Sequence, residues 1–528
     1  MRPAETDARP AANDEWELTL TVARNVSTRY LAIAVEAVLG VLILPFNVAH
    51  LGQSAYGLWM LTASITAYFS VLDLGYGGAL VKFVAQYRAR KDAHALNEIL
   101  STAFWVFAIF GLITYLLAVG LAASLGSLFQ IAPDQLAVGR KVLLIISLNV
   151  AAGTAFGVYG SVINGFQRYD LNNVVGTISS VATAAVNVLV LSLGYDLVAL
   201  VTATTFVRLV TYLVYRANAY RVFPALSIRP SLFRLARLRE LTTFSVYMLT
   251  IDWANKVSYS VDALVIGVFL STTAVAVWAV GQRVAELTQR LSNQLNEVLF
   301  PTIVDCDSVE RAEHLQAIFV QGTRLSLATV VPLAGALAMV AQPLVHAWVG
   351  PTFAGSAIVL QLLAIAAIVR VGTGTATTLL KAAGRHKLMA AASAVSSVCN
   401  LLLSVVIVRR FGLPGVAVAT LVPLVTVSAF VVFPAACHRV GLPIVDGWTK
   451  AVWPALWPAV VMLLFVTATR SQVGDSLIAI AFEVGAAGVV YLGTFAFFGI
   501  SAAERRFYVT RLGELTARFR LQPVSEGA

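Results

Sequence analysis

Charged residues are scarce in this sequence. Asp, Glu, Lys and Arg make up 12% of its 528 residues, and 59% of the residues are hydrophobic. Soluble domains carry about 25% charged residues, and no water-soluble fold could bury so much apolar surface. The scarcity of charge therefore excludes a soluble enzyme or a soluble binding domain, and it predicts a polytopic membrane protein.

Sequence motifs of several functional classes are also absent. The cysteines Cys306, Cys399 and Cys437 form no Cys-x-x-Cys pair, which argues against a disulfide framework or a zinc site. There is no P-loop, no His-Glu-x-x-His and no Gly-x-Ser-x-Gly. We therefore expect no enzymatic activity, no catalytic residue, no cofactor and no metal. No nucleic-acid-binding motif accompanies the net charge of +10, so we assign that charge to cytoplasmic loops and expect no nucleic-acid partner.

Long apolar runs dominate the sequence. Most approach or exceed the roughly 20 residues that cross a bilayer core as a helix. We predict an all-α membrane protein with fourteen transmembrane helices, near residues 30–50, 56–82, 98–122, 138–163, 173–193, 196–215, 242–268, 274–298, 315–341, 356–380, 388–408, 414–436, 451–469 and 477–499.

The distribution of basic residues predicts the orientation of these helices. Of 37 Lys and Arg residues, five fall in predicted outside loops, five fall within predicted spans, and the remaining 27 fall in predicted cytoplasmic loops, tails or span ends. Basic residues concentrate on the cytoplasmic side of membrane proteins. The sequence therefore predicts a multi-pass protein of the plasma (inner) membrane with both termini in the cytoplasm.

Three short matches indicate an internal repeat. Leu51–Trp59 matches Leu270–Trp278, Gln167–Leu171 matches Gly384–Leu388, and Gly194–Ala199 matches Gly412–Ala417, at offsets of 217 to 219 residues. Two halves of six helices with the same orientation form a parallel repeat. The predicted parts are a cytoplasmic tail or interfacial helix (1–28), an N-lobe (29–215), a basic cytoplasmic linker (216–241), a C-lobe (242–437), two extra spans (438–500) and a basic tail (501–528).

Ionisable residues inside the predicted spans are the candidate functional residues. Each costs about 2.5–3.5 kcal/mol at the bilayer centre, so most should face a hydrated interior or one another. The acids are Glu36, Asp73, Asp252, Asp262, Glu286 and Glu483, and the cations are Lys82, Arg208, Lys256, Arg283 and Arg370. Arg24 and Arg29 stand at the cytoplasmic mouth of the first span. The cations indicate a central cavity that can hold an anion, and the planar fork of Arg suits phosphate.

Spacing leaves a structural alternative open for several of these charges. Asp252 and Lys256 are four residues apart on one helix face and can pair. Arg283 and Glu286, three residues apart, can pair in the same way. Lys82 can extend to the inner interface. Glu36, Asp73, Asp252, Asp262 and Glu286 are therefore candidates either for coupling transport to an ion or for structural charge pairs.

Four sequence segments carry a family resemblance. They are LGQSAYGLW with VLDLGYGGALVKFVAQYRARKD in the first hairpin, VINGFQRYDLNNVV at 162–175, VSYSVDALVIGVFLSTTAVAVWAVGQRV at 257–284, and LLKAAGRHKLMAAAS at 379–393. The chain resembles Wzx-type polysaccharide-biosynthesis flippases of the multidrug/oligosaccharidyl-lipid/polysaccharide (MOP) exporter superfamily. The resemblance implies two six-helix bundles around a central cleft, a C-terminal helix pair, and alternating access.

The same resemblance implies a substrate and a set of binding residues. The substrate would be a polyprenyl-pyrophosphate-linked glycan, moved from the inner to the outer leaflet for exopolysaccharide, capsule or O-antigen. Partners would be this glycan, membrane lipids, and a polymerase or other polysaccharide-assembly proteins. In lipid II flippases of this superfamily, arginines at helices 1, 2 and 8 bind the pyrophosphate. Arg24 or Arg29 and Arg283 match two of them by position, whereas predicted span 2 has no Arg. Arg208, Lys256 and Arg370 complete the candidate binding set.

Two other functions are alternatives to a flippase. One is a drug/cation antiporter of the same superfamily; such proteins usually have twelve spans and an acidic site in one lobe. The other is a membrane polysaccharide polymerase or ligase; such proteins have many spans and one large external loop. The extra pair of spans and the embedded cations disfavour the first, and the short predicted outside loops disfavour the second.

Overall fold

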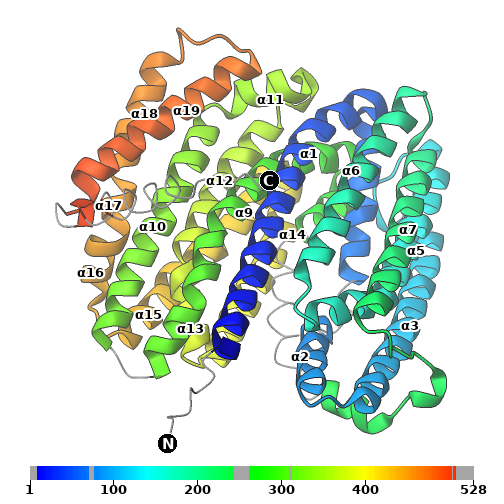
Figure 1. The fold of residues 1–528 in the computed structure, drawn as a ribbon. Coiled ribbons are helices and arrows are strands. Elements are labelled where there is room, and N and C mark those ends of the chain that lie inside the picture. Colours follow the sequence, from blue (N-terminus) through cyan, green and yellow to red (C-terminus); the bar gives the residue numbers. More distant parts are fainter. Residues whose placement is uncertain are drawn as a thin grey trace, which may run out of the picture. The chain divides into compact units, whose positions relative to one another are not determined.

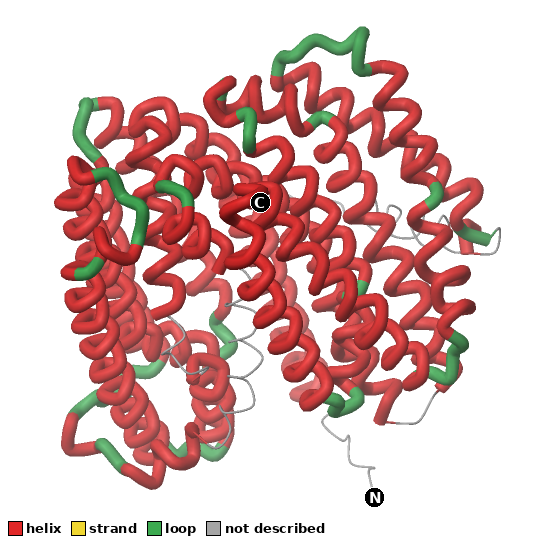
Figure 2. The backbone as a smooth tube through the Cα atoms, turned by 180° about the vertical axis from the view of Figure 1, so that it is seen from behind, coloured by secondary structure: helices red, strands yellow, loops and turns green. Residues whose placement is uncertain are grey.

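The computed structural model describes residues 9–69, 76–242, 261–308, 312–501, 504–506 and 510. Helices account for nearly all of these residues, and no strand occurs among them, as the tube in Figure 2 shows. The predicted all-α class is therefore confirmed. The candidate residues Asp73, Asp252 and Lys256 lie outside the described residues.

Long helices alternate with short connections along the described part of the chain (Figure 1). In the first half the helices are α1 Arg9–Phe69, α2 Tyr76–Ala89, α3 Ala93–Ala123, α4 Leu125–Leu128, α5 Leu136–Gly165, α6 Tyr169–Ser192 and α7 Leu197–Val222. In the second half they are α9 Thr272–Ser308, α10 Ala312–Met339, α11 Ala341–Val349, α12 Ser356–Gly372, α13 Gly374–Ala382, α14 His386–Val427, α15 Phe433–Arg439, α16 Ile444–Gly447, α17 Trp453–Leu456, α18 Pro458–Thr469 and α19 Leu477–Thr494.

Ten helical ranges of the described chain are long and apolar enough to cross a membrane. Two of them, Ser27–Phe69 and His386–Arg439, each bend at a glycine with positive φ and extend over two of the predicted spans. The ten ranges thus overlap twelve of the fourteen predicted spans, although for the predicted span 56–82 the overlap ends at Phe69. Most of the predicted span 242–268 lies outside the described residues, and α9, on the predicted span 274–298, is not among the ten.

The three repeat matches all fall at breaks between helices. Gln167 and Gly384 have φ of 62° and 71°, and Gly194 and Gly412 have φ of 79° and 59°. Gly52, with φ of 75°, interrupts α1, and the helix of residues 261–269 ends just before α9 at the equivalent place. Residues at positive φ favour glycine because a side chain there is strained. The repeat is therefore a repeat of turns as well as of sequence.

Contacts within the chain divide it into two compact units. Unit 1 comprises Met1–Ala279 and Ser404–Gly412. In it α5 packs against α3 and α7, and α6 packs against α1 and α7. At Gly111 on α3, an added Cβ would lie 2.5 Å from the carbonyl oxygen of Ala151 on α5. Small residues permit such close approach of membrane helices.

Unit 2 comprises Val280–Leu403 and Leu413–Ala528. Its central helix is α10, which packs against α12, α18 and α19. Val330 and Ala334 of α10 share one apolar core with Met462 of α18 and Tyr491 of α19. The C-terminal helix pair is therefore built into the core of unit 2. The lobe boundaries at 215 and 242 remain a prediction, because residues 243–260 lie outside the description.

Candidate functional site

Arg24, about four turns into α1, lies in an ion-pair cluster. Its Nε is 3.2 Å from Oδ2 of Asp170, and Nε of Arg168 is 3.1 Å from Oδ1 of the same carboxylate. Asp170, in the first turn of α6, is 7% exposed. Asn25 fixes the contact, since its Oδ1 accepts from the Asp170 N–H at 2.9 Å and its Nδ2 donates to the Gln167 carbonyl at 3.2 Å. Arg24 therefore has a structural partner at this end of the bundle.

Arg29 and Glu36 follow on the same helix and are both exposed. They are seven residues, or about 10 Å, apart along α1, so they lie on similar faces two turns from each other. Among the described residues, no acid lies at ion-pair distance from Arg29. The described residues therefore supply no acidic partner to Arg29.

Arg208 is exposed on α7. Its guanidinium acts electrostatically on the hydroxyl groups of Tyr212 and Tyr215, one and two turns further along the helix. Tyr212 in turn donates a hydrogen bond to Oδ1 of Asn149 on α5 at 3.0 Å. Arg208 thus stands beside a polar seam between α5 and α7, within a segment that is otherwise apolar.

Asp262 is buried in the helix of residues 261–269, with 4% exposure. Its carboxylate interacts electrostatically with Tyr68 near the end of α1. Both residues belong to unit 1. Burial of a carboxylate at this position fits either a structural contact or a coupling role, as the sequence already allowed.

In unit 2, Arg283 and Glu286 are half-buried on α9. The hydrogen bond described for Glu286 comes from Gln282, whose Nε2 donates to Oε1 at 2.7 Å. Gln282 lies one full turn before Glu286, so the pair shares a helix face. Within the described chain, no acid lies at ion-pair distance from Arg283. Arg283 and Glu286, whose spacing allows a pair, form no described ion pair, and Glu286 makes an amide–carboxylate contact instead.

Arg370 is half-buried in the last turn of α12, where a positive charge is favoured by the helix dipole. Thr373 at the break before α13 donates to the carbonyl oxygens of Val369 and Arg370, at 2.8 and 3.4 Å. Arg370, predicted to lie near the middle of the membrane, is therefore close to the break between α12 and α13.

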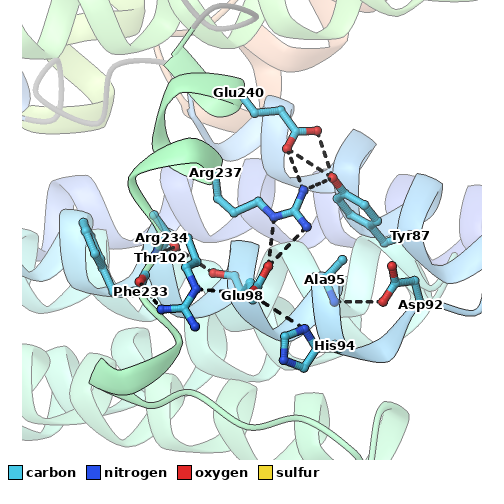
Figure 3. A network of polar contacts seen from close by, with 10 residues as sticks. All are labelled: Tyr87, Asp92, His94, Ala95, Glu98, Thr102, Phe233, Arg234, Arg237 and Glu240. Carbon is cyan, nitrogen blue, oxygen red and sulfur yellow. Dashed lines mark hydrogen bonds and ion pairs between the residues drawn. The ribbon is translucent and has the colours of Figure 1, made fainter.

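Residues 223–242, most of the predicted basic linker and its continuation, bind the start of α3 in a network that the sequence did not predict (Figure 3). Arg237 donates from Nε and Nη2 to Oε2 of Glu98 at 3.2 Å, and from Nη1 to the Tyr87 hydroxyl at 2.7 Å. Nε of Arg234 lies 3.3 Å from Oε1 of Glu98. The same carboxylate thus holds two arginines of the linker. The linker is consequently a fixed part of unit 1.

Tyr87 and Glu240 complete this network. The Tyr87 hydroxyl donates to Oε1 of Glu240 at 2.9 Å. Burial, followed by this hydrogen bond, raises the pKa of Tyr87 above its ordinary value, so the hydroxyl remains a donor. Arg237 also contacts the Tyr87 ring as a cation, with 5.2 Å from its Cζ to the ring centroid. The only signal for this network in the sequence was the density of arginine in the linker.

Two further arginines pair with acids in unit 2. Nη1 of Arg470, the C-cap of α18, lies 2.8 Å from Oε2 of the buried Glu483 in α19. Arg324 of α10 binds Glu504 at 3.0 Å and donates from Nη2 to the Lys450 carbonyl at 2.7 Å. Glu483, a candidate intramembrane acid, therefore has a structural partner.

No group of three or more His, Cys, Asp or Glu side chains in the described ranges could hold a metal ion. The three cysteines are free. Among the described candidate cations, Arg29, Arg208 and Arg283 have no acid at ion-pair distance in the described ranges, and the carboxylate of Glu36 is exposed.

Comparison with known proteins gives concordant results. Residues 50–358, more than half of the chain, match the model of a family described as polysaccharide biosynthesis protein. The probable flippase AglR of Haloferax volcanii is 23% identical over 410 residues, covering 76% of this chain and 80% of AglR. The probable low-salt glycan biosynthesis flippase Agl15 of the same organism is 25% identical over 182 residues, or 34% of this chain and 39% of Agl15.

Solved structures of transporters have the same fold. The lipid II flippase MurJ, in an inward closed conformation, gives a TM-score of 0.72 at 15% identity and covers 90% of this chain and 98% of its own. An inward-facing multidrug resistance MATE family transporter of the MOP superfamily gives 0.58 at 15% identity, covering 77% and 98%. At such identities the likeness shows the fold alone.

Proposed function

Since this chain belongs to the polysaccharide biosynthesis protein family, we propose that it is a membrane flippase for a lipid-linked glycan. The resemblance seen in the sequence is thereby confirmed at the level of the family and the fold. The curated relatives are named as flippases, and none of those described above is named as a catalyst. No step of bond making or breaking is assigned to this chain.

In its finer form, the proposal is that the substrate is a glycan on polyprenyl pyrophosphate, moved from the inner to the outer leaflet of the plasma membrane by alternating access. A charged diphosphate with sugars cannot cross hydrocarbon unaided, because burial of its charges costs far more than thermal energy supplies. Cations in a hydrated path offset that cost while the polyprenyl chain stays in the lipid. Both termini would lie in the cytoplasm.

The observation that carries the proposal is the state of Arg283. It is a half-buried cation on α9, and its expected partner Glu286 is bound by Gln282 instead. A cation in a predicted span is costly unless an acid, a ligand or water neutralises it, and none of the described acids lies at ion-pair distance from Arg283. A guanidinium that can bond two oxygens at once suits a diphosphate.

The other candidate residues have graded roles in this proposal. Arg29 is an exposed candidate diphosphate ligand of unit 1, as Arg283 is of unit 2. Arg208, Lys256 and Arg370 are further cations proposed to favour the anionic substrate. Arg24 is already bound to Asp170 and contributes by holding the helix that carries Arg29. Glu36, Asp73, Asp252, Asp262 and Glu286 are the acids through which transport would be coupled to an ion.

Replacement of Arg283 tests the proposal. We expect Arg283→Ala to lower transport roughly ten- to a hundredfold, because a charge-assisted hydrogen bond contributes about 1.5–3 kcal/mol. Arg283→Lys should retain part of the activity, since it keeps the charge and loses the fork. The measurement is surface glycan in a deletion strain that carries each variant, with the amount of membrane-inserted protein measured in parallel.

The lipid-linked intermediates of the deletion strain decide between functions. Accumulation of the glycan on the inner leaflet supports a flippase, whereas unpolymerised units on the outer face would indicate a polymerase. Normal surface glycan with Arg283→Ala would remove Arg283 from the proposed site. A drug/cation antiporter would leave both glycan pools unchanged in the deletion strain.

A further inference from the structure

A groove of about 860 Å³ runs along unit 1 among α5, α6 and α7. Its wall is largely apolar and includes Val186, Phe206 and Val207. Phe206 is 67% exposed, although it lies in an apolar membrane-spanning range. The groove therefore opens toward the surroundings of the protein rather than into a closed core, and at this depth those surroundings are lipid chains.

One end of the groove is charged. Lys141, in the second turn of α5, and Asp196, the N-cap of α7, both line it. Both side chains are exposed. Asp196 uses Oδ1 to accept the Ala199 N–H at 2.9 Å, which leaves its second carboxylate oxygen for another donor. Among the ion pairs of the described residues, none joins Lys141 to Asp196.

The length of the groove fits one lipid leaflet. From Asp196 to Phe206 the helix rises ten residues, or about 15 Å at 1.5 Å per residue. Half of a bilayer hydrocarbon core is also about 15 Å. A molecule with its polar group at Lys141 and Asp196 would thus place its chain along the apolar wall within a single leaflet.

The charges indicate the kind of headgroup. A diphosphate would gain from Lys141, but Asp196 would repel it. A zwitterionic headgroup with an ammonium group matches both, since its phosphate meets Lys141 and its N–H groups meet the free oxygen of Asp196. We propose that this groove is a binding site for a phosphatidylethanolamine-type phospholipid, distinct from the transport path. The predicted orientation places it in the outer leaflet.

Lipid retention tests the site directly. The protein is reconstituted into nanodiscs of phosphatidylethanolamine, phosphatidylcholine and phosphatidylglycerol in equal parts, and retained lipids are measured by native mass spectrometry. We expect retention of phosphatidylethanolamine above the other two. Phosphatidylcholine lacks N–H donors, so its weaker retention would report the contact with Asp196.

Three variants separate the site from general surface attraction. Lys141→Ala should reduce retained phosphatidylethanolamine several-fold, whereas Arg140→Ala, on the same helix and outside the groove lining, should not. Asp196→Asn preserves a good helix cap and should abolish the preference over phosphatidylcholine. Ala203→Trp should fill the groove and exclude the lipid.

Several outcomes would overturn the proposal. Equal losses with Lys141→Ala and Arg140→Ala would indicate unspecific charge attraction. Retention of a polyprenyl diphosphate in place of the phospholipid, when both are offered, would assign the groove to the transported lipid. A protein dimer that Phe206→Ala dissociates would assign it to a second copy of the chain.

Discussion

The two turns that the internal repeat relates, residues 166–170 at the start of α6 and 383–387 at the start of α14, have similar backbones and different charges. Gln167 and Gly384 occupy equivalent positions at φ of 62° and 71°. In unit 1 the turn is followed by Asp170, which binds Arg24 and Arg168. In unit 2, Lys387 stands at the position of Asp170. One turn therefore neutralises itself, and the other accumulates positive charge.

From this difference we infer a structural role for the turn of unit 1 and propose a binding role for the turn of unit 2. Asn25 of α1 forms hydrogen bonds with the turn of unit 1, and Arg24 of α1 forms an ion pair with Asp170. These contacts hold α1 against α6. The turn of unit 2 exposes Arg385, His386 and Lys387, and no described acid lies at ion-pair distance from any of them. Exposed cations on the predicted cytoplasmic side suit anionic groups from outside the chain, such as lipid phosphates.

The largest expected effect follows from removing the acid of unit 1. Asp170→Ala leaves Arg24 and Arg168 without their partner, and we expect it to lower the free energy of unfolding by about 1–3 kcal/mol. Lys387→Ala, at the equivalent place in unit 2, should change it by less than about 0.5 kcal/mol, because an exposed side chain without partners is removed. Thermal unfolding in detergent measures both. Equal losses would show that the two turns do not differ in role.

A second, smaller effect should follow from giving unit 2 the charge pattern of unit 1. Lys387→Asp removes a cation and places an acid near Arg385, so the turn should attract the anionic substrate less. We expect surface glycan to fall about fivefold, since one charge–charge interaction in water at about 4 Å is near 1 kcal/mol. Stability should stay unchanged. The effect should shrink as ionic strength rises in a reconstituted assay, because salt screens exposed charges. Transport equal to that of the unmodified protein would mean that this turn does not attract the substrate.

The turns and helices were largely predictable from the sequence. Apolar runs of membrane length fixed where helices lie, and the three repeat matches marked positions where the backbone breaks, at Gly52, Gly194 and Gly412 among others. Such signals are local, since a span needs its own length of apolar residues and a turn at positive φ favours its own glycine. They could be read without knowledge of tertiary contacts.

Partners of individual charges were much less predictable. Helix spacing allowed Arg283 to pair with Glu286, but Gln282 binds that acid through the equally allowed contact at one full turn. Glu98 meets Arg234 and Arg237 from positions more than a hundred residues away. Such pairs depend on how helices cross, which periodicity does not encode. The roles predicted for Asp73, Asp252 and Lys256 remain predictions, because these residues lie outside the described ranges.

The smallest expected effect concerns Glu504 of unit 2. This acid has an ion-pair partner, Arg324, whereas the cations of the turn at 383–387 have none among the described residues. Burial acts to raise the pKa of Glu504, but the Ser501 N–H and Arg324 outweigh it and hold this pKa below its ordinary value of 4.5. In the unfolded chain the carboxyl has the ordinary pKa, so it binds a proton more readily there. The contact therefore stabilises above about pH 4.5, and this contribution is lost as pH falls through the lower, folded value.

We expect the contribution of Glu504 to be at most about 1 kcal/mol, because the pair is partly exposed. Glu504→Gln should lower the melting temperature slightly at pH 7 and flatten its fall toward pH 4. Glu313→Gln, at an exposed acid in the first turn of α10, serves as the matched control and should leave the pH profile unchanged. If Glu504→Gln also left the profile unchanged, the contact of Arg324 with the Lys450 carbonyl would be its only stabilising contact among those described above. Unit 2 would then have one stabilising ion pair fewer. It would differ more from unit 1, where Asp170 binds Arg24 and Arg168.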